Sequence, residues 1–148
     1  MDKIKLTRGK YALVDKDDFE KVNQCSWNCL KIGYAQKNSG NKVYMHRFIM
    51  NAPKGTYVDH INGNKLDNRK SNLRLCTQSQ NMANSGKKIT NTSGFKGVSY
   101  DKKAKKWGVY LTFNYKHIFG GYYDDIQKAA DKYVELSERY FSTFTYKK

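Results

Sequence analysis

The chain of 148 residues carries 28 Lys and Arg against 13 Asp and Glu, a net charge of +15, together with 12 Tyr and 2 Trp. A chain of this length holds one domain or two small ones, and neither can bury a large core. Basic charge mixed with aromatic residues favours a nucleic acid as partner. No stretch approaches the length of a bilayer span, so a membrane partner is not expected.

Residues 1–57 predict a small β-rich module. Residues 10–15 read as a strand and 17–22 as a short helical turn, and Trp27, Tyr34 and residues 43–45 indicate further short strands. The first residues lead into a mixed stretch without an apolar core, so no secretory signal is expected. Three cysteines leave at least one unpaired, which suits a reducing cytoplasm.

A zinc site built from cysteines is the weaker of two interpretations. Cys25 and Cys29 have a Cys-x₃-Cys spacing, and Cys76 and His46 would have to complete the set. No second tight pair of ligands exists, so buried thiols are the expected state. His46 stands in a mostly apolar run and is expected to be a structural histidine.

Residues 58–84 gather the polar groups with the clearest chemistry. The pair Asp59-His60 stands between two apolar residues of a predicted strand, and Asn62-Gly63 after it is a turn signal. Residues 72–76 alternate polar and apolar as in a half-buried strand, and a capped helix is expected over 77–84. The predicted order is strand, long loop, strand, helix.

This order of elements can hold one hard cation. Asp59 offers a carboxylate and Asn81, one turn into the helix, a carbonyl oxygen; Mg²⁺ takes one or two such groups and adds water and substrate phosphate. His60 alternates to the opposite side of the strand unless the chain bends there. With a bend it can take a proton from water. Asn72 is a candidate to hold the other imidazole nitrogen through its side-chain carbonyl.

The run Asp59-His60, Asn72, Asn81 resembles the HNH (ββα-metal) endonucleases, in the variant whose last metal ligand is Asn. The resemblance implies that Asp59 and Asn81 are metal ligands, that His60 is the general base, and that Asn72 orients His60. The segments 67–69 and 72–74 look like phage and intron-encoded homing endonucleases of this type. A divalent cation is therefore the expected cofactor, Mg²⁺ first and Mn²⁺ as the alternative.

A boundary is expected at residues 85–93, which are rich in turn formers and lack an apolar period. This linker carries Lys87 and Lys88, which suit a phosphate backbone. Residues 1–91 hold 17 Lys and Arg against 7 Asp and Glu, and residues 92–148 hold 11 against 6. Both halves are expected to face the same polyanion. The predicted domains are 1–84, made of the lead-in 1–57 and the metal motif 58–84, and 94–148.

Residues 94–148 predict a three-stranded antiparallel sheet backed by one helix. Strands are expected over 95–100, 107–113 and 117–122, with a basic loop between the first two. Asp124 can cap a helix with Gln127 at its third position. The fold class expected for the chain is α+β: a β-rich N-terminal module leading into a ββα-metal core, then this sheet and helix.

The second half resembles the Apetala/ethylene-response-factor DNA-binding domain over residues 94–142, through the segments 95–98, 106–107 and 121–123 and the pattern Ala129-Ala130-x-x-Tyr133. The resemblance implies a sheet lying in the major groove. Where plant members carry arginines, this chain has Ser99, Thr112 and His117, so the plant target sequence is not carried over. The candidate DNA contacts are Lys96, Ser99, Lys102, Lys103, Lys105, Lys106, Tyr110, Thr112, His117, Phe119 and Tyr133, with Arg69, Arg74, Lys87 and Lys88 before them.

Three classes of function fit these features. The first is a metal-dependent DNA endonuclease of homing type that nicks or cuts double-stranded DNA, in the cytoplasm of a bacterial host if phage-encoded; no protein partner is implied. The second is a DNA-binding regulator with a non-catalytic HNH scaffold; the intact set of Asp59, His60, Asn72 and Asn81 argues against it. The third is an RNA-binding module, which the basic sheet alone would permit. Plasmid nicking with Mg²⁺, with and without chelator, separates the first from the others.

Overall fold

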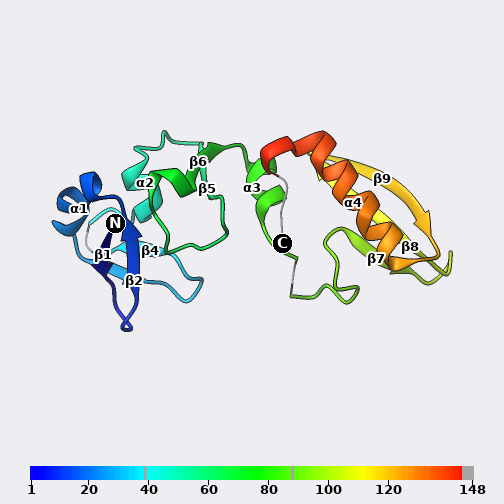
Figure 1. Ribbon diagram of the computed structural model, residues 1–148, viewed down its shortest axis with the longest axis horizontal. Helices are drawn as coiled ribbons and strands as arrows, with labels where there is room; N and C mark the ends of the chain where they lie inside the picture. Colours follow the sequence, from blue (N-terminus) through cyan, green and yellow to red (C-terminus); the bar gives the residue numbers. More distant parts are fainter. Residues whose placement is uncertain (39, 88, 145–148) are drawn as a thin grey trace. The chain divides into compact units, whose positions relative to one another are not determined.

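The computed structural model describes residues 1–38, 40–87 and 89–144. Within them the chain forms four α-helices and several small antiparallel sheets, which confirms the mixed α and β character expected (Figure 1). The chain divides into two compact units, Met1–Thr77 and Gln78–Lys148. Each unit has its own hydrophobic core.

The first unit is a series of hairpins joined by short helices. β1 (Asp2–Lys5) pairs with β2 (Tyr11–Val14), and α1 (Lys16–Asn23) follows. β3 (Trp27–Cys29) pairs with β4 (Ala35–Lys37), and α2 (Met45–Ile49) comes next. β5 (Tyr57–His60) then pairs with β6 (Leu73–Cys76), which a 3₁₀ turn at Lys70–Asn72 precedes.

The strand predicted at residues 43–45 is wrong. Tyr44 forms only an isolated bridge with Gln36, and Met45 begins α2. Met45 and Ile49 are both buried. Because residues four apart lie on one face of a helix, a single helical turn brings both into the core. Tertiary burial therefore decides against the extended conformation here.

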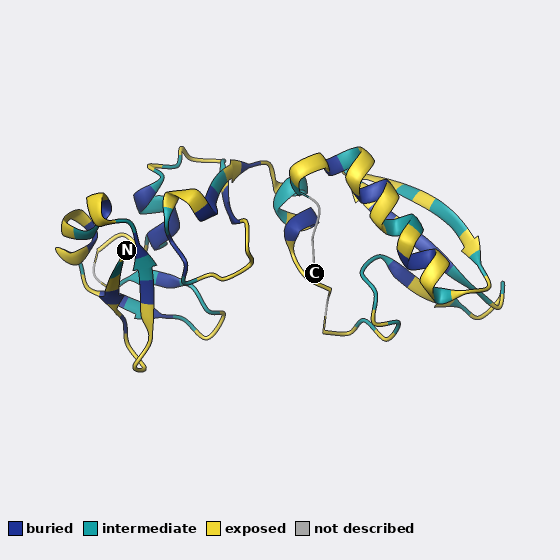
Figure 2. Ribbon diagram, in the orientation of Figure 1, coloured by how far each residue is buried: buried dark blue, intermediate teal, exposed yellow. Residues whose placement is uncertain are grey.

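The core of the first unit also anchors the strands that carry the expected chemistry. Val58 of β5 and Leu73 of β6 belong to the same buried cluster as Val14, Trp27 and Met45. Buried residues are drawn dark blue in both units in Figure 2. The Trp27 indole donates a hydrogen bond to the Val22 carbonyl at 2.9 Å. The β5–β6 hairpin is consequently held by packing and not only by its own ladder.

The second unit combines a three-stranded sheet with a long helix. α3 (Gln78–Asn84) comes first, and β7 (Val98–Asp101), β8 (Lys106–Phe113) and β9 (Lys116–Tyr123) form an antiparallel sheet in that order. α4 (Ile126–Phe141) and a 3₁₀ turn (Ser142–Phe144) end the described chain. The core lies between α4 and one face of the sheet, where Val109 and Leu111 meet Ala129 and Leu136. The other face of the sheet is left to solvent.

The cap of α4 differs from the expected one. The Asp125 carboxylate, not that of Asp124, accepts the Lys128 backbone N–H at 2.8 Å. Asp124 instead forms an exposed ion pair with Lys106 at 3.2 Å. Either of two adjacent aspartates satisfies a capping pattern, and the exit direction of the chain from β9 selects between them.

Candidate active site

β5 holds Asp59 and His60 side by side in the interior of the first unit. Asp59 is 6% exposed and His60 4% exposed. Their partners across the hairpin are Arg74 and Leu73. Successive strand residues point to opposite faces, so the burial of both means that β5 is covered on both sides. After His60 the chain turns, and Gly63, at φ +73°, donates its N–H to the His60 carbonyl at 2.9 Å.

The Asp59 carboxylate is paired with the Arg74 guanidinium. Both Nε and Nη2 of Arg74 donate to Asp59 Oδ2, at 2.9 and 2.8 Å. The two side chains are 7% and 16% exposed, so this is a mostly buried pair. Arg74 was predicted to contact DNA, and in this structure its charge balances the acid expected to bind a metal.

The His60 imidazole is held as a neutral base. Its Nε2 lies 3.4 Å from Asn68 Oδ1, and donation from Nε2–H leaves Nδ1 as the basic nitrogen. Burial lowers the pKa of His60, while the hydrogen bond to Asn68 and the nearby charges of Asp59 and Asp67 act in the opposite direction. A neutral imidazole beside a carboxylate is able to accept a proton at neutral pH.

Aromatic rings surround His60 on the side of α2 and β4. The His46 ring meets the His60 ring edge-on at 5.0 Å between centroids and stacks on Tyr44 at 5.4 Å. Tyr34 lies 5.3 Å from His46 and 5.8 Å from His60. Burial, followed by the charges of His60 and Arg47, lowers the pKa of His46 to about 3. His46 is therefore a buried, neutral member of the wall behind His60.

Asn72 acts on the turn that follows His60. Its Oδ1 accepts the Asn62 N–H at 2.9 Å and its Nδ2 donates to the Asp67 carbonyl at 2.8 Å. Its backbone carbonyl accepts the Ile61 N–H at 2.9 Å. The sequence placed Asn72 against the imidazole, whereas the imidazole hydrogen bond described above goes to Asn68. Asn72 thus fixes the backbone on either side of the long loop.

The loop between β5 and β6 is tied down by Asp67, which is 2% exposed. Arg69 donates to it from Nε and Nη2 at 2.7 and 2.6 Å, and Asn62 from Nδ2 at 2.9 Å. Leu13 of β2 forms backbone hydrogen bonds with Leu66 and Asn68. Arg69, predicted as a DNA contact, is therefore engaged within the loop.

Three residues of this site were not found from the sequence: Asn68, Tyr34 and His46 as neighbours of His60. Asn68 was part of the segment 67–69 that carried the family resemblance, so its position was noted but not its bond. Tyr34 and His46 had no local signal, because Tyr34 directly precedes β4 and His46 lies in α2, both distant from His60 in the sequence. Only the packed structure joins them to β5.

The donor set fits a hard divalent cation in part. Asp59 supplies a buried carboxylate oxygen, and such oxygens are the ligands that Mg²⁺ prefers. Asn81 lies in α3, in the second unit. In residues 1–38, 40–87 and 89–144, no three His, Cys, Asp or Glu gather as ligands. A cation here would thus draw on few protein groups, as Mg²⁺ sites do.

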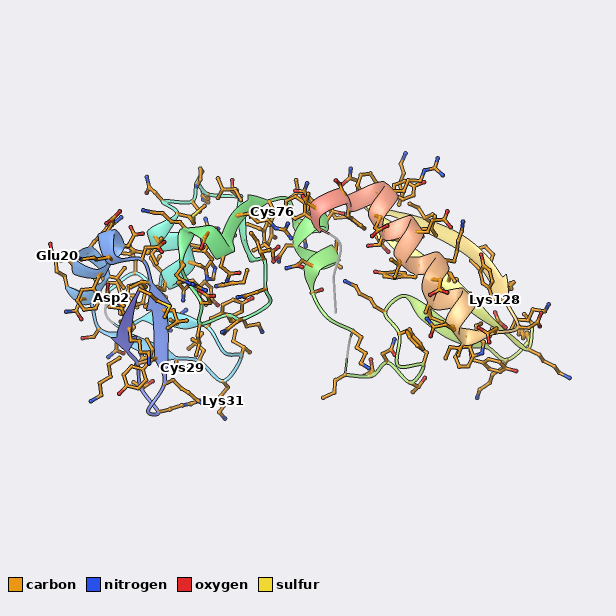
Figure 3. All side chains as sticks on the ribbon, in the orientation of Figure 1. Asp2, Glu20, Cys29, Lys31, Cys76 and Lys128 are labelled. Carbon is orange, nitrogen blue, oxygen red and sulfur yellow. The ribbon has the colours of Figure 1, made fainter. Side chains whose placement is uncertain are left out.

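The cysteines are free thiols. Cys29 ends β3 and Cys76 ends β6 (Figure 3). Both are buried, and Cys25 is half-buried. Burial, with the Asp59 charge adding to it, raises the pKa of Cys76 to about 11. Protonated thiols of this kind are poor metal ligands.

Several candidate DNA contacts of the second unit face solvent. Ser99, Tyr110, Thr112, His117 and Phe119 are exposed on β7–β9, with Thr112 and His117 hydrogen-bonded at 3.1 Å. The turn between β7 and β8 exposes three lysines, Lys102, Lys103 and Lys105, and Asp101 fixes that turn by accepting two backbone N–H groups.

Other candidates have structural partners. The Lys96 ammonium donates to the carbonyls of Met82, Ala83 and Ser85 at 2.8, 2.6 and 2.5 Å, closing the end of α3. Burial lowers the pKa of Lys96 to about 8. Tyr133 packs on Gly97, where an added Cβ would lie 2.0 Å from its ring. Lys87 donates to the Gly94 carbonyl at 3.0 Å. Lys88 lies outside the described residues.

Comparisons with known proteins bear on this site directly. Residues 43–83 match the sequence profile of a family described as HNH endonuclease. "Uncharacterized HNH endonuclease L560" of Acanthamoeba polyphaga mimivirus is 33% identical over 146 residues, covering 93% of this chain and 74% of that protein. No solved structure matches.

Two shorter matches come from bacterial viruses. "Protein 3.8" of Escherichia phage T7 is 46% identical over 55 residues, 37% of this chain and 46% of that protein. The "SPbeta prophage-derived putative HNH homing endonuclease YosQ" of Bacillus subtilis (strain 168) is 43% identical over 56 residues, 34% of this chain and 32% of that protein.

The buried pair of Asp59 and His60 lies on the β5–β6 hairpin, within the segment that matches the family profile. The chain belongs to the HNH endonuclease family. It is an enzyme, a phosphodiester hydrolase acting on DNA. No helix in the described part of the chain is long and apolar enough to span a membrane.

Proposed function

We propose that this protein is a metal-dependent endonuclease of homing type that nicks or cuts double-stranded DNA. The observation that carries the proposal is the placement of Asp59 and His60 next to each other on β5, both buried and both held by neighbouring side chains. The prophage relative whose printed name includes homing endonuclease supports the homing type.

In the proposed reaction His60 is the general base. Its Nδ1 takes a proton from the attacking water, while Nε2 keeps its proton toward Asn68. The lowered pKa of His60, caused by burial, favours the unprotonated ring that this step needs. His46 and Tyr34 limit the rotation of the ring by contact on one side. Asn72 acts one step away, by fixing the turn that leaves His60.

Asp59 is the first proposed protein ligand of a divalent cation, Mg²⁺ or Mn²⁺. Asn81 is the second proposed ligand, and its assignment rests on the sequence motif alone. When bound, the cation neutralises charge on the phosphate and the leaving oxygen. Arg74 already balances the Asp59 charge at 2.8 Å. Arg74 therefore holds the Asp59 carboxylate, which would be the protein ligand of a bound cation, in a fixed orientation.

The second unit is proposed to position the DNA, as its resemblance to the Apetala/ethylene-response-factor domain implies. The exposed lysines of the β7–β8 turn would contact phosphates, and the exposed face of the sheet would contact bases. Free thiols in the first unit support action in a reducing cytoplasm, that of a bacterial host if the gene is carried by a phage.

A plasmid-nicking assay tests the proposal. The full chain should cut with Mg²⁺ or Mn²⁺ and stop cutting with chelator. His60→Ala should lower the rate by about 10²–10⁴-fold with little change in DNA affinity. Asp59→Ala and Asn81→Ala should regain part of their activity as Mn²⁺ is raised. Tyr11→Leu, an exposed substitution on β2 of the same unit, is the control.

Each outcome selects a function. Wild-type cutting by His60→Ala would remove His60 from the reaction. DNA binding without metal-dependent cutting by the natural chain would favour the alternative function, a DNA-binding regulator that keeps the HNH scaffold without its activity. Tight binding of RNA, with neither DNA binding nor cutting, would favour an RNA-binding module.

A further inference from the structure

The solvent-facing side of the β7–β9 sheet carries three aromatic rings in mutual contact. Tyr110 and Phe119 are paired across β8 and β9, with centroids 5.4 Å apart. Phe119 and Tyr122 meet edge-on at 4.9 Å. The three residues are 43%, 53% and 42% exposed. Tyr110, Phe119 and Tyr122 therefore form one continuous exposed aromatic surface, called the aromatic platform below.

A glycine allows one of these rings to lie against the strand. A Cβ added at Gly108 would stand 2.7 Å from Cε2 and from the hydroxyl of Tyr110. The Tyr110 ring thus covers the backbone of Gly108, which is buried beneath it, and turns its other face outward. A ring that lies along a sheet presents a flat π surface, whereas an upright ring presents an edge.

Hydrogen bonds hold the edge of the aromatic platform. The Tyr122 hydroxyl donates to Asp101 Oδ2 at 2.8 Å. This bond and one with Tyr110 raise the pKa of Tyr122. Asp101 Oδ1 also accepts the backbone N–H groups of Lys103 and Ala104. The hydroxyl groups of Tyr110 and Tyr122 are therefore held by hydrogen bonds before any ligand binds.

The charges around the aromatic platform favour a polyanion. The turn that Asp101 fixes exposes three lysines at one end of the sheet, Lys102, Lys103 and Lys105, and Lys116 begins β9 at the opposite end. Of the two acids that follow β9, Asp124 pairs with Lys106 and Asp125 caps α4. Flat rings bordered by ammonium groups match a ligand with flat bases and phosphates.

The side chains of this face are poorly suited to reading base edges in a duplex. Edge contacts that distinguish bases come chiefly from Arg or Lys at guanine and from Asn or Gln at adenine. The central outward positions of β7, β8 and β9 hold hydroxyl, imidazole and aromatic groups: Ser99, Tyr110, Thr112, His117, Phe119 and Tyr122. Stacking, in contrast, needs only an exposed ring face.

We propose that the aromatic platform binds unpaired bases of a DNA strand by stacking, with the neighbouring lysines on its phosphates. In a duplex the faces of the bases are stacked on one another, so rings on a sheet meet them only where the strands are separated. The inference deepens the proposed DNA-positioning role of the second unit and rests on it. It makes double-stranded DNA that contains an unpaired segment the preferred substrate class.

Binding of labelled oligonucleotides to the full chain tests this proposal, in buffer with chelator so that no strand is cut. The probes are an oligothymidylate of about 12 nucleotides, an abasic strand with the same number of phosphates, and the thymidylate paired with its complement. An oligouridylate of equal length separates DNA from RNA. Circular dichroism confirms that each variant is folded.

Phe119→Leu removes the central ring and keeps an apolar side chain. It should weaken oligothymidylate binding by about 5- to 150-fold and leave the abasic strand unaffected. Phe119→Trp retains a ring and should bind as tightly as the natural chain or more tightly. The matched control is Tyr11→Leu, since Tyr11 is 50% exposed on β2 and lies outside the aromatic platform. It should change neither affinity.

Four results would overturn the proposal. Equal affinity for the base-bearing and abasic strands would leave only phosphate contacts. Equal binding by Phe119→Leu and the natural chain would remove the ring from recognition. A duplex bound as tightly as the single strand would mean that the aromatic platform binds paired DNA. Tighter binding of oligouridylate than of oligothymidylate would mean that its ligand is RNA. Because this assay measures binding and no cutting, its result is independent of the plasmid-nicking assay. A protein without nicking activity can still bind unpaired bases, and a protein that nicks DNA can lack this binding.

Discussion

The pair of Asp59 and Arg74 gives a prediction in which stability and metal binding are linked. Arg74→Met removes two hydrogen bonds of 2.9 and 2.8 Å from a carboxylate that is 7% exposed. Removing one partner of a buried pair costs roughly 3–5 kcal/mol, because the remaining charge is left in a poorly solvated place. Since Arg74 is itself 16% exposed, we expect a loss near the lower limit, about 3 kcal/mol.

A divalent cation should return part of this loss. In Arg74→Met the Asp59 carboxylate has lost its cationic partner, and a bound cation supplies a positive charge in its place. A ligand at 100 times its Kd stabilises the folded state by about 2.7 kcal/mol. Mn²⁺ should therefore stabilise Arg74→Met more than it stabilises the natural chain, in which Arg74 already balances the carboxylate.

Urea unfolding followed by tryptophan fluorescence measures both effects. Trp27 is 3% exposed in the core of the first unit, and a Trp107→Phe background removes the signal of the second unit. Lys54→Met is the control, because Lys54 is an exposed residue of the same unit and its replacement should change the stability by less than about 1 kcal/mol. A loss for Arg74→Met no larger than that of the control would refute the buried-pair reasoning, and a variant indifferent to Mn²⁺ would refute Asp59 as a ligand.

Two further predictions concern the second unit. Gly97→Ala should lower Tm much more than Gly94→Ala. Both residues have positive φ, near +69° and +82°, but only at Gly97 does an added Cβ meet the Tyr133 ring, at 2.0 Å. Equal losses of Tm would show that backbone strain alone matters. Lys96 has its pKa lowered by burial to about 8 from 10.5, so between those values the unfolded chain holds a proton that the folded chain has released. Folding stability should then rise with pH through this window, and the rise should be absent in Lys96→Met when urea unfolding is compared at both ends of it; a parallel rise in the variant would show another group titrating.

The predicted sheet of the second half shows what a strong pattern determines. A strand was expected over 107–113, where Trp107, Val109, Leu111 and Phe113 alternate with other residues, and β8 packs Val109 and Leu111 into the core of the second unit. A period of two fixes which side chains share a face, whatever surrounds the strand. The same argument failed at residues 43–45, where a short apolar run fitted both strand and helix and the core selected the helix.

In the first unit, Asp59 and His60 are neighbours in the chain, so their proximity needed no structure, and the pair Asn62-Gly63 predicted the turn that follows them. Family resemblance pointed to the same residues. Tertiary structure alone decided what each group contacts. Asn68 reaches His60 because the loop between β5 and β6 folds back onto β2, and His46 reaches it from a helix fourteen positions earlier in the chain.

Long basic side chains show most clearly which features follow from the sequence and which require the tertiary structure. Composition determined that the surface would be basic, but not which cations would remain available to DNA. Register across β5 and β6 places Arg74 opposite Asp59, and packing of the second unit places Lys96 at the end of α3. A flexible side chain of this length finds a carboxylate, a carbonyl or solvent with equal ease. Its partner is therefore decided by distances that exist only once strand register and loop closure are fixed.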